Sequence, residues 1–455
     1  MAEIAAPTGE ALVDETGEHA AQPTVSAAYR RYALWVLLLI YVVNFLDRQV
    51  INILAEPIKN DLHLLDWQVG MLSGFAFGLV YTLLGFPLAR AADRGNRVWI
   101  ISGCLAAWSG FTAVCGLAQN FGQLVAARAG VGVGEAGCTP TSHALIADYT
   151  PKEKRASALA FYAMGTPIGS LLGLAIGGFL ADSFGWRTAF LVAAVPGFAL
   201  AVLALVTLKE PRRRIARAAA QVEGGMATFR ETFHCLRQKK AYWYLAWAAG
   251  IRSFLGYAAA TFFPSFLYRS HTAGVAALAH QFGMKPQTFV GLSLGLIAGG
   301  AGTLGAWLGG QLADRWGKRD LRVYGSVPAI SVLLALPFSL VIYTTSSASL
   351  AIWLTAATNL LGSLWYGPVY SSAQGMVPPK MRAMSASIML FVINFLGLVL
   401  GALATGALAD VLNTSFHLGK AEGLRWALIL TVSAGSVSAL LFWLARGRVR
   451  EEMVS

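Results

Sequence analysis

The 455-residue sequence is 56% hydrophobic and only 13% charged, and its mean hydropathy of +0.58 excludes an ordinary soluble globular protein. The net charge of +12 does not indicate nucleic-acid binding, because the basic residues fall in short segments between apolar runs. Cys104, Cys115, Cys138 and Cys235 show no ligand or disulfide spacing, and no nucleotide-binding loop or hydrolase motif occurs. We therefore expect no metal, no cofactor and no enzyme activity.

Apolar runs long enough to cross a bilayer recur along the chain. They lie at 32–58, 68–90, 97–118, 121–148, 156–182, 187–208, 241–268, 287–312, 321–343, 350–377, 383–411 and 424–446. Between the two sets, 209–240 has the composition of a basic linker, 270–286 is predicted to be a loop, and 1–31 and 447–455 are predicted to be tails. The sequence therefore predicts an all-α integral membrane protein with twelve transmembrane helices, in six-helix bundles at 32–208 and 241–446.

The distribution of Lys and Arg predicts the orientation in the membrane. With the N-terminus inside, 26 of the 35 basic residues fall at inner helix ends and six fall outside. Such a bias is typical of cytoplasmic loops. We expect both termini to be cytoplasmic, in a protein of the cell membrane.

The two halves repeat one another at spacings of 221 to 228 residues. Ala89-Arg-Ala-Ala-Asp93-Arg-Gly-Asn-Arg97 corresponds to Gly310-Gln-Leu-Ala-Asp314-Arg-Trp-Gly-Lys-Arg319, and the segment ending in Arg155 corresponds to the segment ending in Arg382. Gly178-Phe-Leu-Ala-Asp182 corresponds to Gly406-Ala-Leu-Ala-Asp410. Three such pairs indicate a duplicated bundle, a common transporter architecture.

Four charged residues lie inside apolar runs of the first half. Asp47, followed by Arg48, lies about 22 Å along its helix from the inner end, and Glu135 lies about 21 Å along another. Arg128 precedes Glu135 by two turns on the same face. We expect one neutral buried cluster, in which Asp47 is the main protonation switch, Glu135 a second titrating site, and the arginines their alternating partners. A static lock between helices is the alternative.

In the second half, Arg252 lies inside an apolar run with no acidic residue at a matching depth. An unpaired intramembrane arginine favours an anionic substrate group such as a phosphate, whereas snorkelling or pairing with helix carbonyls is the alternative. Several residues of the same half are candidates for lining an amphipathic cavity, although each also suits plain packing. They are Tyr257, Phe262, Phe263, Trp365, Tyr366, Tyr370 and Asn394.

The Asp-Arg-x-Gly-Lys-Arg loop at Asp314, its weaker copy at Asp93 and the duplicated halves resemble the major facilitator superfamily. Within it, Asn44-Phe-Leu-Asp-Arg-Gln-Val-Ile-Asn52, Arg128-Ala-Gly-Val-Gly-Val-Gly-Glu-Ala136 and Thr150-Pro-Lys-Glu-Lys-Arg-Ala156 resemble the Spinster family. The resemblance implies a secondary transporter that alternates between inward- and outward-open states. It also implies proton-linked transport and substrates such as sphingosine-1-phosphate or lysophospholipids. The copy at Asp93 departs from the family pattern at Ala89 and Asn96.

The resemblance further implies that charged residues at the inner helix ends form a cytoplasmic gate that is shut in the outward-open state. Those residues are Asp93, Arg94, Arg97, Arg155, Asp314, Arg315 and Arg382. Asp93 is expected to bond a helix N-terminus and to pair with Arg155. A purely topogenic role of these charges is the alternative.

The sequence therefore predicts a proton-coupled transporter, acting as a monomer, of an amphipathic, lipid-like and anionic substrate. One alternative is a drug/proton antiporter for amphiphilic cations, although such an exporter would need an uncompensated acid where this chain has Arg252. An alternative of another class is a membrane sensor or scaffold that no longer transports.

Overall fold

The computed structural model describes residues 25–151, 154–210, 228–317 and 319–453, and it is all-helical in these ranges. The first half contains α1 (Ala27–Asp61), α2 (Asp66–Gly70), the π-helix η1 (Met71–Phe75), α3 (Ala76–Arg94), α4 (Arg97–Leu117), α5 (Phe121–Ala136), α6 (Cys138–Tyr149), α7 (Arg155–Ala163) and α8 (Gly165–Thr207). Gly185 in α8 has a φ of 82°, so that α8 is two helices joined at this glycine.

The second half begins with α10 and is also entirely helical in its described residues. It contains α10 (Phe229–Arg237), α11 (Lys240–Ser270), α12 (Thr272–Gln281), α13 (Pro286–Gly317), α14 (Val323–Thr344), α15 (Ala348–Ser363), α16 (Tyr366–Gly375), the 3-10 helix η4 (Pro379–Met381), α17 (Arg382–Asn394), the π-helix η5 (Phe395–Leu400), α18 (Gly401–Thr414), α19 (Gly419–Ser433) and α20 (Gly435–Glu452). Within the described ranges, nine helical spans are long and apolar enough to cross a membrane.

The structure differs from the sequence prediction at three segments. The predicted loop 270–286 contains α12, whose alanine-rich sequence favours a helix and whose Val275 and Ala279 are buried one turn apart. The predicted linker contains α10, which begins with a capping box formed by Thr228 and Glu231. The helix α1 begins at Ala27 inside the predicted tail, and the part of that tail before residue 25 lies outside the described residues.

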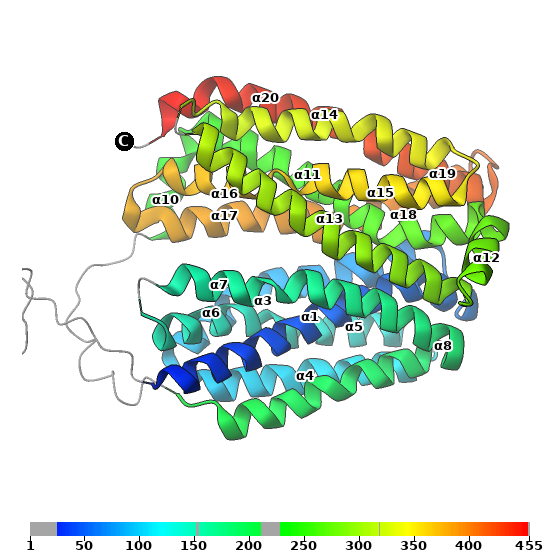
Figure 1. The fold of residues 1–455 in the computed structure, drawn as a ribbon, viewed down its shortest axis with the longest axis horizontal. Coiled ribbons are helices and arrows are strands. Elements are labelled where there is room, and N and C mark those ends of the chain that lie inside the picture. The colour runs from blue at the N-terminus through cyan, green and yellow to red at the C-terminus, as the bar shows by residue number, and fades with distance from the viewer. Residues whose placement is uncertain (1–24, 152–153, 211–227, 318, 454–455) are drawn as a thin grey trace, which may run out of the picture.

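The described chain begins and ends at the same end of the molecule, which we call the termini end, and we call the opposite end the distal end (Figure 1). The ribbons of the two halves converge at the distal end and diverge toward the termini end. Between the halves, α8 packs against α13, α2 and η1 pack against η5 and α18, and α1 packs against α11. The halves therefore meet chiefly through these three groups of helices.

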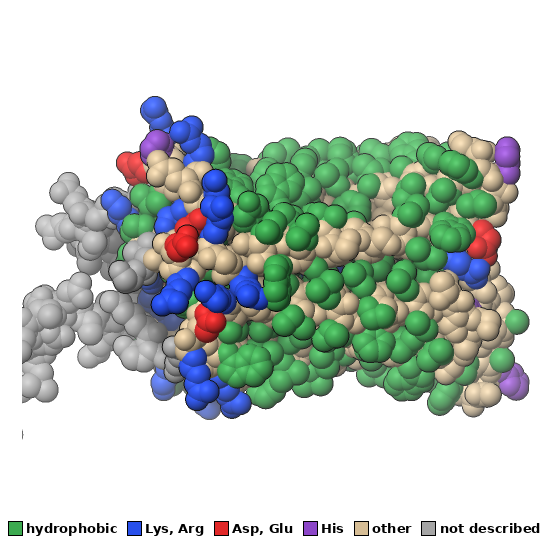
Figure 2. Space-filling model, turned by 90° about the horizontal axis from the view of Figure 1, so that it is seen from above, with side chains coloured by type: hydrophobic (Ala, Val, Ile, Leu, Met, Phe, Trp, Pro, Cys, Tyr) green, Lys and Arg blue, Asp and Glu red, His purple; other side chains and the backbone are tan. Residues whose placement is uncertain are grey.

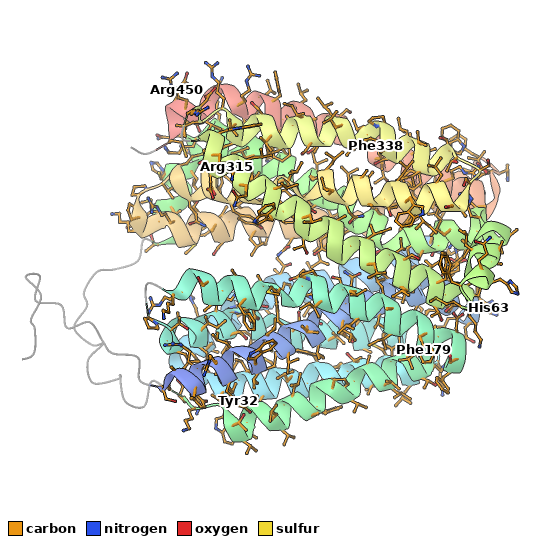
Figure 3. The ribbon with its side chains drawn as sticks, in the orientation of Figure 1. Tyr32, His63, Phe179, Arg315, Phe338 and Arg450 are labelled. Atoms are coloured by element: carbon orange, nitrogen blue, oxygen red, sulfur yellow. The ribbon has the colours of Figure 1, made fainter. Side chains whose placement is uncertain are left out.

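The outer surface has the distribution of side chains that a membrane protein needs. Hydrophobic side chains cover the middle of the face in view, while Lys and Arg gather at the termini end (Figure 2). Arg315 and Arg450 lie toward that end, His63 lies at the distal end, and Phe338 lies on the outer face between them (Figure 3). An apolar band between polar ends is what a bilayer requires.

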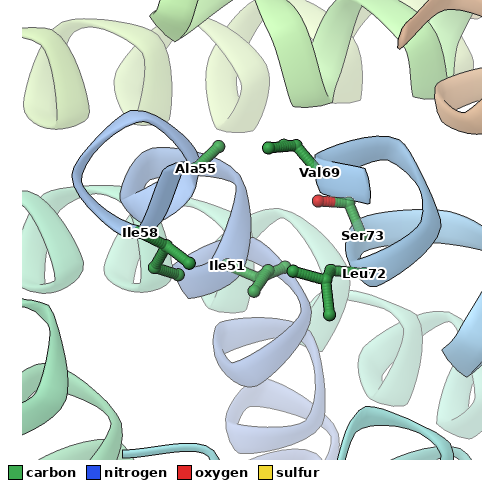
Figure 4. A pocket seen from close by; sticks show the side chains of 6 residues that line it. All are labelled: Ile51, Ala55, Ile58, Val69, Leu72 and Ser73. Atoms are coloured by element: carbon green, nitrogen blue, oxygen red, sulfur yellow. The ribbon is translucent and has the colours of Figure 1, made fainter. Parts of the chain in front are cut away.

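Apolar side chains line a small pocket between α1 and the segment formed by α2 and η1. Ile51, Ala55 and Ile58 of α1 face Val69 and Leu72 of α2 and η1, with the hydroxyl of Ser73 at the margin (Figure 4). These α1 residues follow Asp47 along the helix toward the distal end. The pocket on the distal side of the charged cluster is therefore almost entirely apolar.

Candidate functional site

The four intramembrane charges of the first half form two ion pairs between α1 and α5. Nη1 of Arg128 lies 3.5 Å from Oδ2 of Asp47, and Nε of Arg48 lies 2.6 Å from Oε2 of Glu135. Asp47, Arg128 and Glu135 are at most 1% exposed. Neighbouring residues on α1 point about 100° apart, so each pairs with a different residue of α5. The expected cluster is present, and its pairing is crosswise.

Further polar contacts fix the Asp47–Arg128 pair. The hydroxyl of Thr112 on α4 donates to Oδ1 of Asp47 at 2.8 Å. Nε of Arg128 donates to the carbonyl oxygen of Leu72 at 3.4 Å. Since two further elements hold this pair, it links α1, α4, α5 and η1.

The Arg48–Glu135 pair is held by one hydrogen bond and by aromatic rings. The Arg48 guanidinium carbon lies 4.5 Å from the ring centre of Tyr81 and 5.0 Å from that of Phe77. The same Phe77 ring lies 5.3 Å from the Arg128 guanidinium carbon. Arg48 Nη2 and Glu135 Oε1 are buried without a hydrogen-bond partner among the described residues. This pair is therefore the less completely satisfied of the two.

Glycines of α5 explain how these charges come so close to the neighbouring helices. A Cβ at Gly134 would lie 2.5 Å from the backbone nitrogen of Trp108 on α4, and one at Gly132 would lie 2.7 Å from the carbonyl oxygen of Phe77 on α3. The sequence Arg128-Ala-Gly-Val-Gly-Val-Gly-Glu135 thus combines charges with a face on which helix backbones touch.

The arginines of the cluster face a small cavity between the two halves, of about 50 Å³. The cavity is lined by Phe45, Arg48, Gln49, Asn52, Ser73, Gly74, Phe77 and Arg128 of the first half, and by Tyr257, Ala260, Thr261, Leu398 and Ala402 of the second. The Thr261 hydroxyl donates to Oδ1 of Asn52 at 3.2 Å across it. The volume has room for a few water molecules, and its polar lining suits them.

Arg252 lies on α11, and within the described part of the chain it forms no ion pair with a carboxylate. Its guanidinium lies against Gly362 of α15, where a Cβ would be 1.8 Å from Nη2. Gly362 therefore provides the space that Arg252 occupies.

The other predicted substrate residues fall into two groups. Tyr257 lines the cavity, Tyr366 is 44% exposed, and Asn394 is half-buried at the end of α17. Trp365 is buried and stacks on Tyr366 at 4.2 Å between ring centres. Phe263 is buried against Phe266 and Tyr343, at ring-centre distances of 6.0 and 6.4 Å, and so packs in the interior of the second half.

The expected pairing of Asp93 with Arg155 cannot be followed, because the side chain of Asp93 lies outside the described part, and the described gate residues at the termini end make the following contacts. Arg97 pairs with Asp148, and Nε of Arg155 donates to the carbonyl oxygen of Thr150, both within the first half. Three residues of the second half are exposed, and the side chains of two residues at the end of α3 lie outside the described part. The exposed residues are Asp314, Arg315 and Arg382, and the residues outside are Asp93 and Arg94.

The sequence did not predict a charged network at the distal end, where Lys59 and Arg269 are two of the six basic residues expected outside the membrane. Nη2 of Arg269, on the second half, lies 2.7 Å from Glu56 and 2.8 Å from Asp66 of the first half. Lys59 lies 2.5 Å from Oδ1 of Asp66. The sequence contains acidic and basic residues near the distal helix ends of both halves, and this could have indicated ion pairs between the halves.

Comparison with known proteins supports one family for the whole chain. The Major Facilitator Superfamily model matches residues 37–402. An "MFS-type efflux pump" of Mycolicibacterium smegmatis is 34% identical over 93% of this chain and 94% of its own length. "Protein spinster homolog 3" of Danio rerio is 25% identical over 96% of this chain and 89% of its own length.

A solved structure has the same fold. It is described as a bacterial homolog to the human lysosomal transporter Spinster in an inward-facing and unoccupied conformation. It is 30% identical, with a TM-score of 0.84, over 95% of this chain and 100% of the other. These relatives are transporters and not enzymes. The chain therefore belongs to the Major Facilitator Superfamily, and within that superfamily it is similar to the Spinster proteins.

Proposed function

We propose that this transporter couples the movement of an amphipathic, lipid-like and anionic substrate to protons by alternating access. The observation that carries the proposal is the neutral, buried cluster of Asp47, Arg48, Arg128 and Glu135 beside a cavity between the halves. Buried charges in a membrane protein are costly and usually mark a substrate or proton path. A lysophospholipid or a sphingosine-phosphate-like molecule is the substrate class that best fits the remaining residues.

In this scheme a proton acts by changing the net charge of the cluster. Protonation of either carboxylate removes one negative charge and leaves the four residues with a net positive charge. The arginine that loses its partner then favours a new anionic or hydrogen-bonding contact, which lowers the free energy of a different helix arrangement. Asp47 is the main switch in this scheme, and Glu135 is the second titrating site.

Arg252 is the proposed binding group for the anionic part of the substrate. It has no ion-pair partner among the described residues, and its guanidinium is seated against the backbone at Gly362. A guanidinium binds phosphate or carboxylate through two parallel hydrogen bonds. Tyr257, Tyr366 and Asn394 supply aromatic and polar surface in the same half, which suits an amphipathic molecule.

The proposed topology has twelve transmembrane passes and cytoplasmic termini in the cell membrane, and the protein is proposed to act as a monomer. Nine spans in the described residues are long and apolar enough, and one of them contains the bent α8, whose two parts would each cross the membrane. The helix α11 and the α5–α6 segment are also long enough to cross, which brings the proposed number to twelve. The polar contacts between the halves concentrate at the distal end, as in Arg269–Glu56. These features support an inward-facing state, with the gate residues at the termini end on the cytoplasmic side.

Export of amphiphilic cations is a second candidate function. The relative from Mycolicibacterium smegmatis is described as an efflux pump, and the exposed Tyr366 would suit an aromatic cation. The unpaired Arg252 opposes a cationic substrate by charge repulsion.

Uptake into proteoliposomes tests the proposal. Purified protein is given lysophospholipids, sphingoid phosphates and cationic dyes in turn, with and without a pH gradient across the liposome membrane. We expect movement of anionic lipids that responds to the gradient. Movement of the dyes without movement of the lipids would contradict the proposed substrate class, and lipid movement that ignores the gradient would contradict proton coupling.

A further inference from the structure

The repeated segments Gly178-Phe-Leu-Ala-Asp182 and Gly406-Ala-Leu-Ala-Asp410 occupy corresponding places in the two halves. The first lies in α8 shortly before its bend at Gly185, and the second lies in α18 near the end of that helix. In each segment the glycine precedes the aspartate by four residues, which is about one helical turn. Both aspartates lie at the distal end, where the halves meet.

Asp182 bonds the first turn of α13 in the opposite half. Its Oδ2 accepts hydrogen bonds from the backbone nitrogen of Thr288 at 2.7 Å and from the Thr288 hydroxyl at 2.8 Å. Lys285, which directly precedes α13, donates from Nζ to the backbone oxygen of Asp182 at 2.7 Å. A carboxylate of the first half thus caps a helix of the second.

Asp410 makes the corresponding contact in the other direction. Its Oδ1 accepts from the backbone nitrogen of Asp66 at 3.1 Å, and its Oδ2 accepts from that of Trp67 at 2.7 Å. These nitrogens begin the 20-residue helical span Asp66–Gly85, which includes α2 and η1. A carboxylate of the second half thus caps a helix of the first.

The glycine of each segment allows the capped helix to approach. A Cβ at Gly178 would lie 2.4 Å from the carbonyl oxygen of Gln287, and one at Gly406 would lie 2.3 Å from that of Asp66. Both distances are too short for any side chain. The same backbone contact, followed one turn later by the same cap, therefore occurs twice, once on each pair of interface helices.

The free N–H groups of a helix N-terminus attract a carboxylate, both by hydrogen bonding and through the helix dipole. Here each carboxylate comes from the opposite half, so the two caps exist only while the distal ends are together. We propose that Asp182 and Asp410 are paired positioning residues, which hold the distal end closed and set the balance between the two states of the transporter. This inference rests on the alternating access in the proposed function.

Distance measurements between spin labels test the inference without a substrate. In a background lacking the four native cysteines, labels at the exposed loop residues Gln119 and Ser346 report the distal end. Labels at the exposed residues Lys154 and Lys380 report the termini end. Asp182→Ala and Asp410→Ala should each raise the ratio of distal-open to distal-closed molecules about fivefold, and the double variant about 25-fold, because the caps are separate.

Matched variants separate this role from a general loss of stability. Asp182→Asn and Asp410→Asn keep an acceptor oxygen and should restore most of the distal-closed population, because Asn caps helices nearly as well as Asp. Asp61→Ala removes a distal carboxylate whose partner Arg187 lies in the same half, and it should leave the ratio unchanged. If one alanine variant does not fold, the other tests the inference alone.

The inference is supported if two sets of spin-label distances change together. The distal distances should lengthen, and the termini-end distances should shorten in the same molecules. Unchanged distances in the folded alanine variants would overturn it. So would a shift equal to that of Asp61→Ala, or distal lengthening without shortening at the termini end, which would indicate local fraying. A shift in these distances with no transport of any tested lipid would contradict the proposed substrate and leave the inference supported.

Discussion

Nε of Arg48 lies 2.6 Å from Oε2 of Glu135, whereas the other carboxylate oxygen of Glu135 is buried without a hydrogen-bond partner in the described part of the chain. The Asp47 carboxylate differs, because Thr112 and Arg128 bind its two oxygens separately. Protonation of Glu135 therefore has a different consequence from protonation of Asp47. On Glu135 it can occupy the free oxygen while the bond to Arg48 persists, and on Asp47 it competes with an existing bond.

This difference predicts how the two acids respond to substitution. Asp47→Asn should abolish the pH dependence of uptake, because it removes the titrating group whose bonds must change. Glu135→Gln should weaken that dependence without removing it. The measurement is initial uptake of the transported lipid at a series of external pH values. Glu422→Gln, which removes an acid paired with Arg425 at the distal end, is the control and should behave like the wild type. Full pH dependence in Asp47→Asn would show that another group is the switch.

The stability of the Arg48–Glu135 pair can be examined by a double-mutant cycle. Glu135→Gln alone leaves the buried Arg48 without an anionic partner, and Arg48→Gln alone leaves a buried carboxylate. Each should lower stability by about 3–5 kcal/mol, reduced for Glu135→Gln by the aromatic rings around Arg48. The double variant should recover most of the loss, because no unpaired charge remains.

Thermal unfolding in detergent gives the four values of that cycle. The wild type and the three variants are compared in the same detergent. Additive losses in the double variant would show that the two residues are energetically independent despite their short distance.

The depth of charged residues along the predicted helices was sufficient to predict that Asp47, Arg48, Arg128 and Glu135 cluster. It could not predict which acid meets which arginine, because that depends on the rotation of α1 about its axis against α5. Composition could not separate Phe263, which packs in the interior, from Tyr257, which lines the cavity. Both are aromatic residues of one apolar helix, and only the packing of neighbouring helices distinguishes them.

The contacts at the distal end could not be predicted from the sequence for a related reason. Asp182 and Asp410 were visible as a repeat, but their partners are backbone nitrogens, which carry no sequence signal. Arg269 and Glu56 lie 213 residues apart, and neither belongs to a repeated motif. Contacts between the halves depend on how the two halves are placed against each other, so a pattern within one half does not specify them.

The space beside Arg252 predicts an effect of Gly362→Ala on binding. The new methyl group would overlap Nη2 of Arg252, so the guanidinium must move. We expect at least tenfold weaker binding of an anionic lipid, which corresponds to about 1.4 kcal/mol, roughly the value of one charged hydrogen bond. Binding is measured by the intrinsic tryptophan fluorescence of the purified protein during titration with the lipid.

Gly300→Ala is the matched control for that variant, because a Cβ at this glycine of α13 meets no atom within 4 Å. It should bind the lipid as the wild type does. Equal affinity for Gly362→Ala and the wild type, in protein of unchanged thermal stability, would exclude Arg252 as the group that binds the anion.

The last prediction concerns Arg269, which crosses between the halves at the distal end. Arg269→Ala removes hydrogen bonds to both Glu56 and Asp66, so that Asp66 keeps Lys59 and Glu56 keeps no ion pair among the described residues. Each charged hydrogen bond contributes about 1.5–3 kcal/mol, so the distal-open state should become at least tenfold more populated.

A cysteine that replaces Thr261 reports this change, because Thr261 lines the cavity between the halves. A membrane-impermeant thiol reagent added from the distal face should label it at least tenfold faster in Arg269→Ala. Arg187→Ala breaks an exposed pair within one half, worth about 0–1 kcal/mol, and should not change the labelling rate. Equal labelling in the two variants would mean that Arg269 stabilises the fold and does not select the distal-closed state.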